Sequence, residues 1–324
     1  MSKMTYSKAL ALGMSEEMRR DENVVFWGLD IAEYGGAFGA SRGMVEEFGH
    51  GRVICMPISE AGYTGLAVGA AASGLRPIVE LEFGDWVTIA SDQLVNQAAN
   101  MRYMFGGSLS IPMVMRLPCG AYGSAAAQHS HMFESWFAFI PGLRVVAPST
   151  PAEAKGMMKA AIRDNNPVIF LEHRICYQME GEVPEDTEFI VPIGSAEIMR
   201  KGKDITIVTY SYMVHFALEA AERLAKEGID VEIVNVRSIK PWDEDMVLSS
   251  VRKTSKALVL SETYKEFGAS AEFAATIAEK AFDYLDAPVK RIGCLQAPVP
   301  CNPDLENYIL PSVDKIVATV KSMF

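Results

Sequence analysis

The stretch Val53-Ile54-Cys55-Met56-Pro57-Ile58-Ser59-Glu60-Ala61-Gly62 contains the pattern on which the fold prediction rests. Its apolar run, residues 53–56, predicts a β-strand, and the small residues at 62–74 predict a closely packed helix. Glu60 lies between the two, just beyond the end of the strand. Because ligands of open α/β sheets bind beyond the carboxyl ends of the strands, this position predicts a functional carboxylate.

The same alternation of strand and helix recurs along the chain. Predicted strands lie at residues 24–28, 53–56, 77–81, 112–116, 143–147 and 168–171, and then at 205–210, 231–236, 257–261 and 289–292. Predicted helices lie at residues 6–20, 64–74, 87–102 and 152–163, and then at 214–226, 244–252, 269–282 and 312–322. This alternation predicts the α/β class, with two doubly wound domains built on mainly parallel sheets.

An acidic stretch at residues 177–192 interrupts the alternation and predicts an exposed connector between domains. We therefore expect a first domain at residues 1–178, a connector at 179–197 and a second domain at 198–324.

Composition excludes several classes of function. The net charge is −11, from 30 Lys and Arg against 41 Asp and Glu, and no basic run is present, so nucleic acid and anionic membranes are not expected partners. No apolar stretch approaches the roughly 20 residues that span a bilayer, and the N-terminus leads directly into a charged helix rather than a signal peptide. The five cysteines have no C-x-x-C spacing, which favours reduced thiols and a cytoplasmic location.

His129 is the second titratable residue that follows a predicted strand. It lies in Ala127-Gln128-His129-Ser130-His131, after a loop rich in glycine and alanine. His131 would face the other way on an extended segment, which disfavours a metal ion shared by the two histidines. The chain contains no G-x-G-x-x-G after a strand, no P-loop, no H-E-x-x-H and no G-x-S-x-G pattern. These absences argue against the corresponding nucleotide, zinc and serine chemistries.

Taken one at a time, the candidate residues have plainer explanations. A glutamate such as Glu60 is common at a helix N-terminus, where it interacts with the helix dipole. His129 alone fits a capping or core histidine, and Trp86 alone fits core packing. The functional interpretation depends on the sequence that surrounds them.

Ordered blocks across nearly the whole chain resemble the β subunit of the thiamine-diphosphate-dependent, decarboxylating first component of 2-oxo-acid dehydrogenase complexes. That family includes pyruvate, branched-chain 2-oxo-acid and acetoin dehydrogenases. The blocks are Pro57-Ile58-Ser59-Glu60, Gly74-Leu75-Arg76-Pro77, Asp92-Gln93-Leu94-Val95-Asn96, Met101-Arg102-Tyr103-Met104-Phe105-Gly106-Gly107, Ala127-Gln128-His129-Ser130, Ile140-Pro141-Gly142-Leu143, Ile162-Arg163-Asp164-Asn165-Asn166-Pro167-Val168, Leu285-Asp286-Ala287-Pro288 and Leu310-Pro311. The resemblance implies a pyrimidine-binding domain of the thiamine-diphosphate-binding fold, followed by a transketolase C-terminal-like domain.

The resemblance also implies roles for individual residues. Glu60 is expected to hydrogen-bond N1′ of the aminopyrimidine ring of thiamine diphosphate and to promote loss of the proton at C2. His129 is expected on the substrate side, in proton handling and in acyl transfer to a lipoyl group. Ile58, Glu82 and Trp86 are expected to bind the pyrimidine end of the cofactor. The Gly-Asp-Gly motif with which the family holds the diphosphate and Mg²⁺ is absent, so the resemblance assigns that role to an α subunit.

The implied assembly is an α2β2 heterotetramer that passes its acyl product to a lipoyl acyltransferase core. Residues 92–104 are expected to mediate β–β self-association. The resemblance further implies a K⁺ ion held by oxygens of Ala161, Ile162, Asp164 and Asn166. The alternative at that segment is a helix C-terminus whose carbonyls are closed by Asn165 or Asn166.

Two positions depart from the family pattern. Leu29 stands where members usually carry a glutamate of an acidic path between active sites, and Glu82 stands where an uncharged residue is common. The substrate therefore stays open between a 2-oxo acid such as pyruvate and acetoin. A non-catalytic scaffold subunit is a further alternative.

Overall fold

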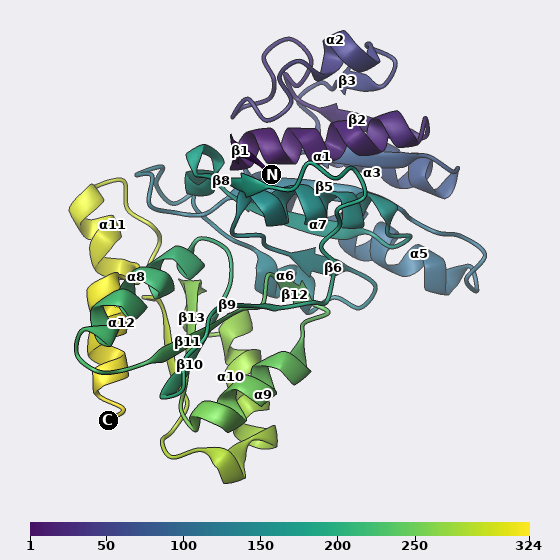
Figure 1. The fold of residues 1–324 in the computed structure, drawn as a ribbon. Coiled ribbons are helices and arrows are strands. Elements are labelled where there is room, and N and C mark those ends of the chain that lie inside the picture. The colour runs from purple at the N-terminus through teal and green to yellow at the C-terminus, as the bar shows by residue number, and fades with distance from the viewer. The chain divides into compact units, whose positions relative to one another are not determined.

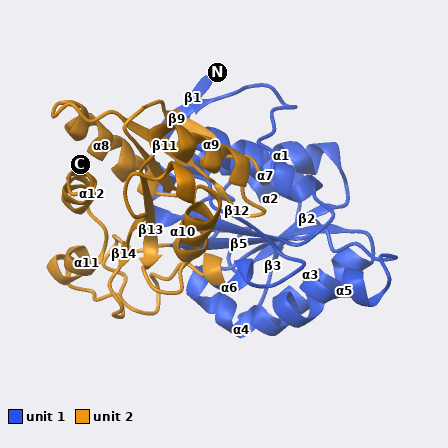
Figure 2. Ribbon diagram, turned by 90° about the horizontal axis from the view of Figure 1, so that it is seen from below, with its two compact units in different colours: residues 1–119, 136–193 blue, residues 120–135, 194–324 orange.

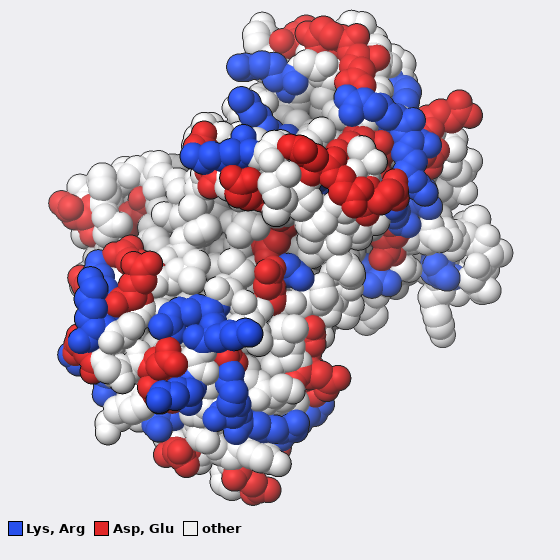
Figure 3. Space-filling view, in the orientation of Figure 1, with Lys and Arg blue, Asp and Glu red and all other residues white.

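The structure, a computed structural model, describes residues 1–324 (Figure 1). It divides into two compact units, residues 1–119 with 136–193 and residues 120–135 with 194–324 (Figure 2). None of the helices has the length and apolar character that a membrane span requires. On the face shown in Figure 3, Lys and Arg side chains are interspersed with Asp and Glu.

The first unit is built on a parallel sheet whose strands lie in the order β6-β7-β5-β4-β2-β3. The strands are β2 (Val24–Gly28), β3 (Val53–Cys55), β4 (Arg76–Glu80), β5 (Val114–Cys119), β6 (Arg144–Val146) and β7 (Val168–His173). Every residue of β2, β5 and β7 is buried, as expected for a parallel sheet covered by helices on both faces. The predicted α/β class is confirmed.

Helices cover this sheet. They are α1 (Tyr6–Arg20), α2 (Met44–Phe48), α3 (Glu60–Ala72), α4 (Val87–Asp92), α5 (Ala99–Met104), α6 (Glu134–Ala138) and α7 (Pro151–Arg163), with 3-10 turns at Gly84–Trp86 and Arg174–Gln178. Helices α1 and α7 pack side by side, and a Cβ on Gly13 would lie 2.9 Å from the Lys155 carbonyl oxygen. Glycine therefore allows this close approach.

The segment predicted as one helix, residues 87–102, is interrupted. A π-helical stretch, Gln93–Ala98, separates α4 from α5. In a π-helix each backbone N–H donates to the carbonyl five residues earlier instead of four. The side-chain amide of Asn100 also donates a hydrogen bond to the Val95 carbonyl, at 2.9 Å. Apolar periodicity cannot distinguish this stretch from a continuous α-helix.

Part of the acidic stretch expected as a connector is ordered on the first unit. Strand β8 (Glu180–Val183) pairs antiparallel with β1 (Ser2–Thr5). The chain then runs past the ammonium group of Lys155, which donates to the Pro184 carbonyl at 2.9 Å and pairs with Glu16 at 2.8 Å. This pairing of chain segments far apart in sequence leaves no local pattern, so neither strand was predicted.

The second unit has its own sheet, in the order β14-β13-β10-β11-β9, with β9 antiparallel and the other strands parallel. Its elements are β9 (Glu197–Arg200), β10 (Ile205–Thr209), α8 (Met213–Ala225), β11 (Val231–Asn235), β12 (Ser238–Lys240), α9 (Glu244–Thr254), β13 (Ala257–Tyr264), α10 (Ala269–Lys280), a 3-10 turn (Phe282–Tyr284), β14 (Lys290–Cys294), α11 (Pro303–Ile309) and α12 (Val313–Lys321). Helices α8 and α12 close one apolar core, in which Ile207, Leu224 and Ile316 are fully buried.

Candidate active site

The sheet of the first unit changes winding direction at β2. From β2 the chain goes to its neighbour β3 on one side, and then to β4 on the other. The switch point of such a sheet lies between the two oppositely wound halves, and the carboxyl ends of the strands there form the usual ligand crevice. The chain beyond these ends contains Asp30 after β2, Glu60 after β3 and Glu82 after β4.

Glu60 is the first residue of α3, so the helix begins before the predicted start at residues 62–64. Ser59 occupies the N-cap position without a side-chain cap bond, and Glu60 is the acidic residue of the first turn. Its side chain is 8% exposed. An acidic side chain in the first turn of a helix lies near the positive end of the helix dipole.

Glu82 and Glu60 are close enough to influence each other electrostatically. Burial raises the pKa of the Glu82 carboxyl, and the negative charges of Asp30 and Glu60 raise it further. Tyr63, one helical turn after Glu60, is buried, and its pKa is raised by burial and by the negative charges of Glu60, Glu82 and Glu80. The site therefore combines carboxylates with a carboxyl that retains its proton to higher pH and can donate a hydrogen bond.

An aromatic cluster follows Glu82 along the chain. The Phe83 ring lies 5.5 Å from the Trp86 ring and 5.3 Å from the Phe38 ring, and the Arg174 guanidinium lies over Phe83 at 5.3 Å. Ile58 is 80% exposed. Flat apolar rings beside carboxylates suit a planar heteroaromatic ligand, which needs stacking surface on its faces and hydrogen-bonding groups at its edge.

A buried ion cluster lies on the strands behind these groups. The guanidinium of Arg116 on β5 bonds to Glu172 on β7 and contacts Glu80 on β4. Burial raises the pKa of Glu80 to about 7 despite the opposing charge of Arg116. Gly36 packs against the Glu80 carboxyl so closely that a Cβ there would overlap it. The cluster links the three neighbouring strands below the candidate site.

His129 belongs to the second unit, in the loop formed by residues 120–135. Its side chain is partly buried, and its backbone amide donates to the Ala126 carbonyl at 3.3 Å. His131 lines a small cavity of the second unit, together with Glu262 and Thr263, and His129 does not. The two histidines thus have different surroundings.

The predicted K⁺ segment lies at the C-terminus of α7. The Arg76 guanidinium donates to the carbonyls of Ile162 at 2.8 Å and Asp164 at 3.1 Å. The Asp164 carboxylate pairs with Arg144 at 2.8 Å and accepts the Asn166 amide, also at 2.8 Å. Positive charge from Arg76 therefore already faces two of the oxygens expected to hold a cation.

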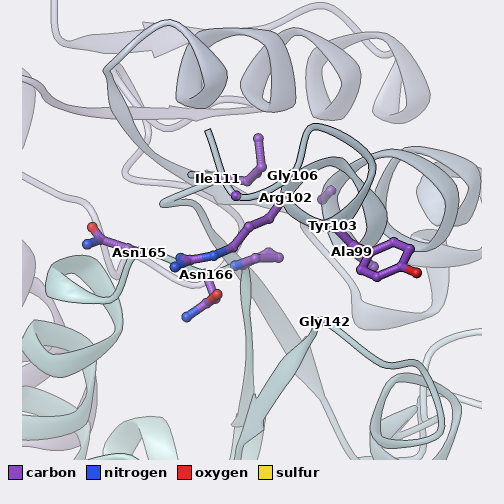
Figure 4. A pocket seen from close by; sticks show the side chains of 11 residues that line it. Ala99, Arg102, Tyr103, Gly106, Ile111, Gly142, Asn165 and Asn166 are labelled. Atoms are coloured by element: carbon purple, nitrogen blue, oxygen red, sulfur yellow. The ribbon is translucent and has the colours of Figure 1, made fainter. Parts of the chain in front are cut away.

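A cavity of about 450 Å³ in the first unit does not include Glu60 in its lining (Figure 4). Arg102 and Tyr103 from α5 and Asn165 from the loop after α7 line it. Tyr103 is 90% exposed, and its neighbour in the chain, Met104, is 71% exposed. In the whole described chain, residues 1–324, no group of His, Cys, Asp and Glu side chains forms a metal site.

The sequence places the chain among characterised proteins. Residues 2–179 match the family model described as the pyrimidine-binding domain of transketolase, and residues 194–316 match the C-terminal domain of transketolase. Over 323 residues the chain is 45% identical to the pyruvate dehydrogenase E1 component subunit beta of Rhizobium meliloti (strain 1021), covering 100% of this chain and 70% of that protein.

Two Bacillus subtilis (strain 168) proteins are similarly close. The acetoin:2,6-dichlorophenolindophenol oxidoreductase subunit beta is 44% identical, covering 97% of this chain and 95% of that one. The 2-oxoisovalerate dehydrogenase subunit beta is 42% identical, covering 100% and 99%. Among solved structures, a chain titled "Split gene transketolase, inactive beta4 tetramer" has a TM-score of 0.79 at 21% identity, covering 99% of this chain and 98% of that one, which shows the shared fold.

Proposed function

This chain belongs to the family of β subunits of thiamine-diphosphate-dependent 2-oxo-acid and acetoin dehydrogenases, and on that premise we propose that it supplies the pyrimidine side of a shared active site. It is an oxidoreductase subunit of transketolase-like fold that works with an α subunit. The observation that carries the proposal is the grouping of Glu60 and Glu82 at the switch point of the first sheet.

The residues of this chain fit an aminopyrimidine ring. The ring presents a basic nitrogen and an amino group at its edge, and Glu60 offers the oxygen that would hydrogen-bond N1′. Glu82, whose pKa is raised, offers either an acceptor or a donor to the same edge. Ile58 and Trp86 would supply apolar surface. When bound, the cofactor supplies the carbon nucleophile, at C2 of its thiazolium ring, and the electron sink for decarboxylation.

The α subunit, in this proposal, holds the diphosphate and Mg²⁺. Diphosphate binding needs a cluster of backbone donors and a metal held by oxygen ligands, and the Gly-Asp-Gly motif that does this in the family is absent here. We propose an α2β2 heterotetramer in the cytoplasm, with β–β contact through residues 92–104 and delivery of the acyl group to a lipoyl acyltransferase core. His129 would act on the substrate side, in proton handling and acyl transfer.

A K⁺ ion at Ala161, Ile162, Asp164 and Asn166 remains part of the proposal. A carbonyl oxygen has two lone pairs, so the bonds from Arg76 to the carbonyls of Ile162 and Asp164 leave acceptor capacity at both oxygens. The ion would then share these carbonyls with the guanidinium.

For the substrate, we propose pyruvate or a related 2-oxo acid, with acetoin as the alternative. The presence of Glu60, Trp86 and His129 disfavours a non-catalytic scaffold, because such a subunit has no need of these side chains.

Calorimetry with thiamine diphosphate and Mg²⁺ tests the shared site. The isolated chain should bind weakly or not at all, and mixing it with its α subunit should restore tight binding. Micromolar binding by the isolated chain contradicts the proposal. Turnover of pyruvate, 2-oxoisovalerate and acetoin by the reconstituted enzyme then identifies the substrate, and failure to turn over any of them contradicts a catalytic role.

A further inference from the structure

The loop of residues 120–135, which carries His129, has a strained backbone. Tyr122, Ser124 and Ala126 have φ values of 63°, 53° and 64°. This left-handed region is unfavourable for residues with a Cβ, and non-glycine residues adopt it where surrounding contacts enforce it. Ala126, the last of the three, is hydrogen-bonded to the histidine: the backbone N–H of His129 donates to the Ala126 carbonyl at 3.3 Å.

Buried carboxylates of the same unit hold the strained segment. Glu262, on β13, accepts the backbone amide of Ala121 at 2.6 Å. Glu306, on α11, accepts the backbone amide of Ser124 at 3.0 Å and faces its hydroxyl at 3.4 Å. The two glutamates are 5% and 3% exposed. A buried charge–amide bond is stronger than a neutral one, and its loss leaves the donor unsatisfied.

Further contacts hold the loop on both sides of His129. The Tyr122 hydroxyl donates to the Pro311 carbonyl at 2.9 Å, and its ring packs 5.5 Å from Tyr212. At the far end, Glu134 accepts hydrogen bonds from Tyr210 at 2.9 Å and from Thr263 at 2.6 Å. Contacts with the rest of the second unit therefore hold the loop in place on both sides of the histidine.

We propose that Glu306 and Glu262 are positioning residues that hold the strained loop and thereby keep His129 placed for the acyl-transfer step. The inference rests on the proposed function of His129. It assigns the second unit a part in the reaction, because the carboxylates that fix the histidine loop come from its strand β13 and its helix α11. Without Glu306, the left-handed residues relax and His129 loses its fixed position.

The test uses the reconstituted αβ enzyme with Glu306→Ala and Glu306→Gln. Glutamine keeps a carbonyl oxygen that accepts the Ser124 amide, so it should rescue what alanine loses. Glu306→Ala should lower kcat for transfer to a lipoyl acceptor by about tenfold, the loss expected for one buried hydrogen bond, with KM for the 2-oxo acid unchanged. Glu306→Gln should stay within about threefold of wild type. Glu266→Ala, an exposed glutamate after β13, is the matched control and should leave activity unchanged.

Amide hydrogen exchange of residues 120–135 measures, independently of catalysis, how firmly the bond between Glu306 and the Ser124 amide holds the loop. It should accelerate in Glu306→Ala and not in Glu266→Ala. Loop exchange at the wild-type rate in Glu306→Ala overturns the proposal, and so does equal loss of transfer in the alanine and glutamine variants. If Glu306→Ala does not fold, Glu306→Asp replaces it, because aspartate is one methylene too short to keep the bond. A wild-type enzyme that turns over neither 2-oxo acids nor acetoin instead contradicts the proposed function, and the hydrogen-exchange result can still be interpreted.

Discussion

The guanidinium of Arg116 donates two hydrogen bonds of 2.7 Å to the carboxylate of Glu172, and both side chains are fully buried. Glu80 contacts the same guanidinium from the other neighbouring strand. A buried charge without a partner strongly destabilises the folded state. Arg116 therefore provides the positive charge that these buried carboxylates need in the core.

Arg116→Met should therefore destabilise the first unit severely. Removal of one partner of a buried pair costs about 3–5 kcal/mol, because the remaining charge stays in an apolar environment. Urea unfolding of the full chain measures the change in the free energy of unfolding. The matched control is Arg19→Met, whose bidentate pair with Glu47 is largely exposed, and it should cost less than about 1 kcal/mol. Equal costs for the two variants contradict the assigned role of the cluster.

Glu134 should make the stability of the second unit depend on pH. Burial raises its pKa from 4.5 to about 7, with a small addition from Glu262, and the hydrogen bonds from Thr263 and Tyr210 offset only part of this. The folded chain then binds more protons than the unfolded chain between these values, so stability falls as pH rises from about 4.5 to 7.

Glu134→Gln removes that ionisation. Relative to wild type, the variant should gain stability between pH 5 and pH 8, by up to roughly 3 kcal/mol for a shift of this size. The raised pKa of Glu80 makes the same contribution to the pH dependence of stability in both proteins, so that contribution cancels when the variant is compared with wild type. Unfolding curves at several pH values provide the measurement, and a difference that stays constant with pH contradicts the prediction.

The exposed apolar side chains at the end of α5 should mediate self-association. Tyr103, Met104 and Phe105 are 90%, 71% and 53% exposed, an apolar surface that a lone chain leaves in water. Tyr103→Asp should shift the chain towards monomer in light scattering. Phe267→Asp is the control, because Phe267 is 91% exposed and lies in the second unit. A wild-type chain that is monomeric at high micromolar concentration contradicts the proposed β–β contact.

The cation segment after α7 is tested by thermal unfolding. If K⁺ shares the carbonyls of Ile162 and Asp164 with Arg76, the Tm should be higher in potassium than in tetramethylammonium at equal ionic strength. Sodium and potassium should differ as well, since carbonyl cages discriminate by ion size. An identical Tm in all three salts means that Arg76 alone closes the end of the helix.

Elements with continuous apolar periodicity were predictable from sequence. Helix α1 and strand β2 have the predicted ends, and α7 begins at Pro151 with the capping box of Thr150 and Glu153. Strands β1 and β8 were missed, because four polar or mixed residues carry no period and gain their structure by pairing across the unit.

The site was predictable only in part. Family resemblance indicated Glu60 and Glu82, and the structure brings them together. Asp30 and Tyr63 were missed, because their nearness to Glu82 and Glu60 arises from neighbouring strand ends and not from spacing in the chain. Arg116 was missed for a related reason. A charged residue inside an apolar strand gives no sign of its partners until the sheet aligns them.

Exchange of the C2 proton of thiamine diphosphate in the reconstituted enzyme tests the central claim most directly. Glu60→Gln keeps the size of the side chain but removes the carboxylate, so exchange should slow, with a barrier higher by about 2–4 kcal/mol, while the αβ assembly stays intact. His129→Ala should exchange at close to the wild-type rate and fail in the later proton and acyl-transfer steps. Wild-type exchange and turnover in Glu60→Gln would contradict the role of Glu60 and, with it, the catalytic function of this chain.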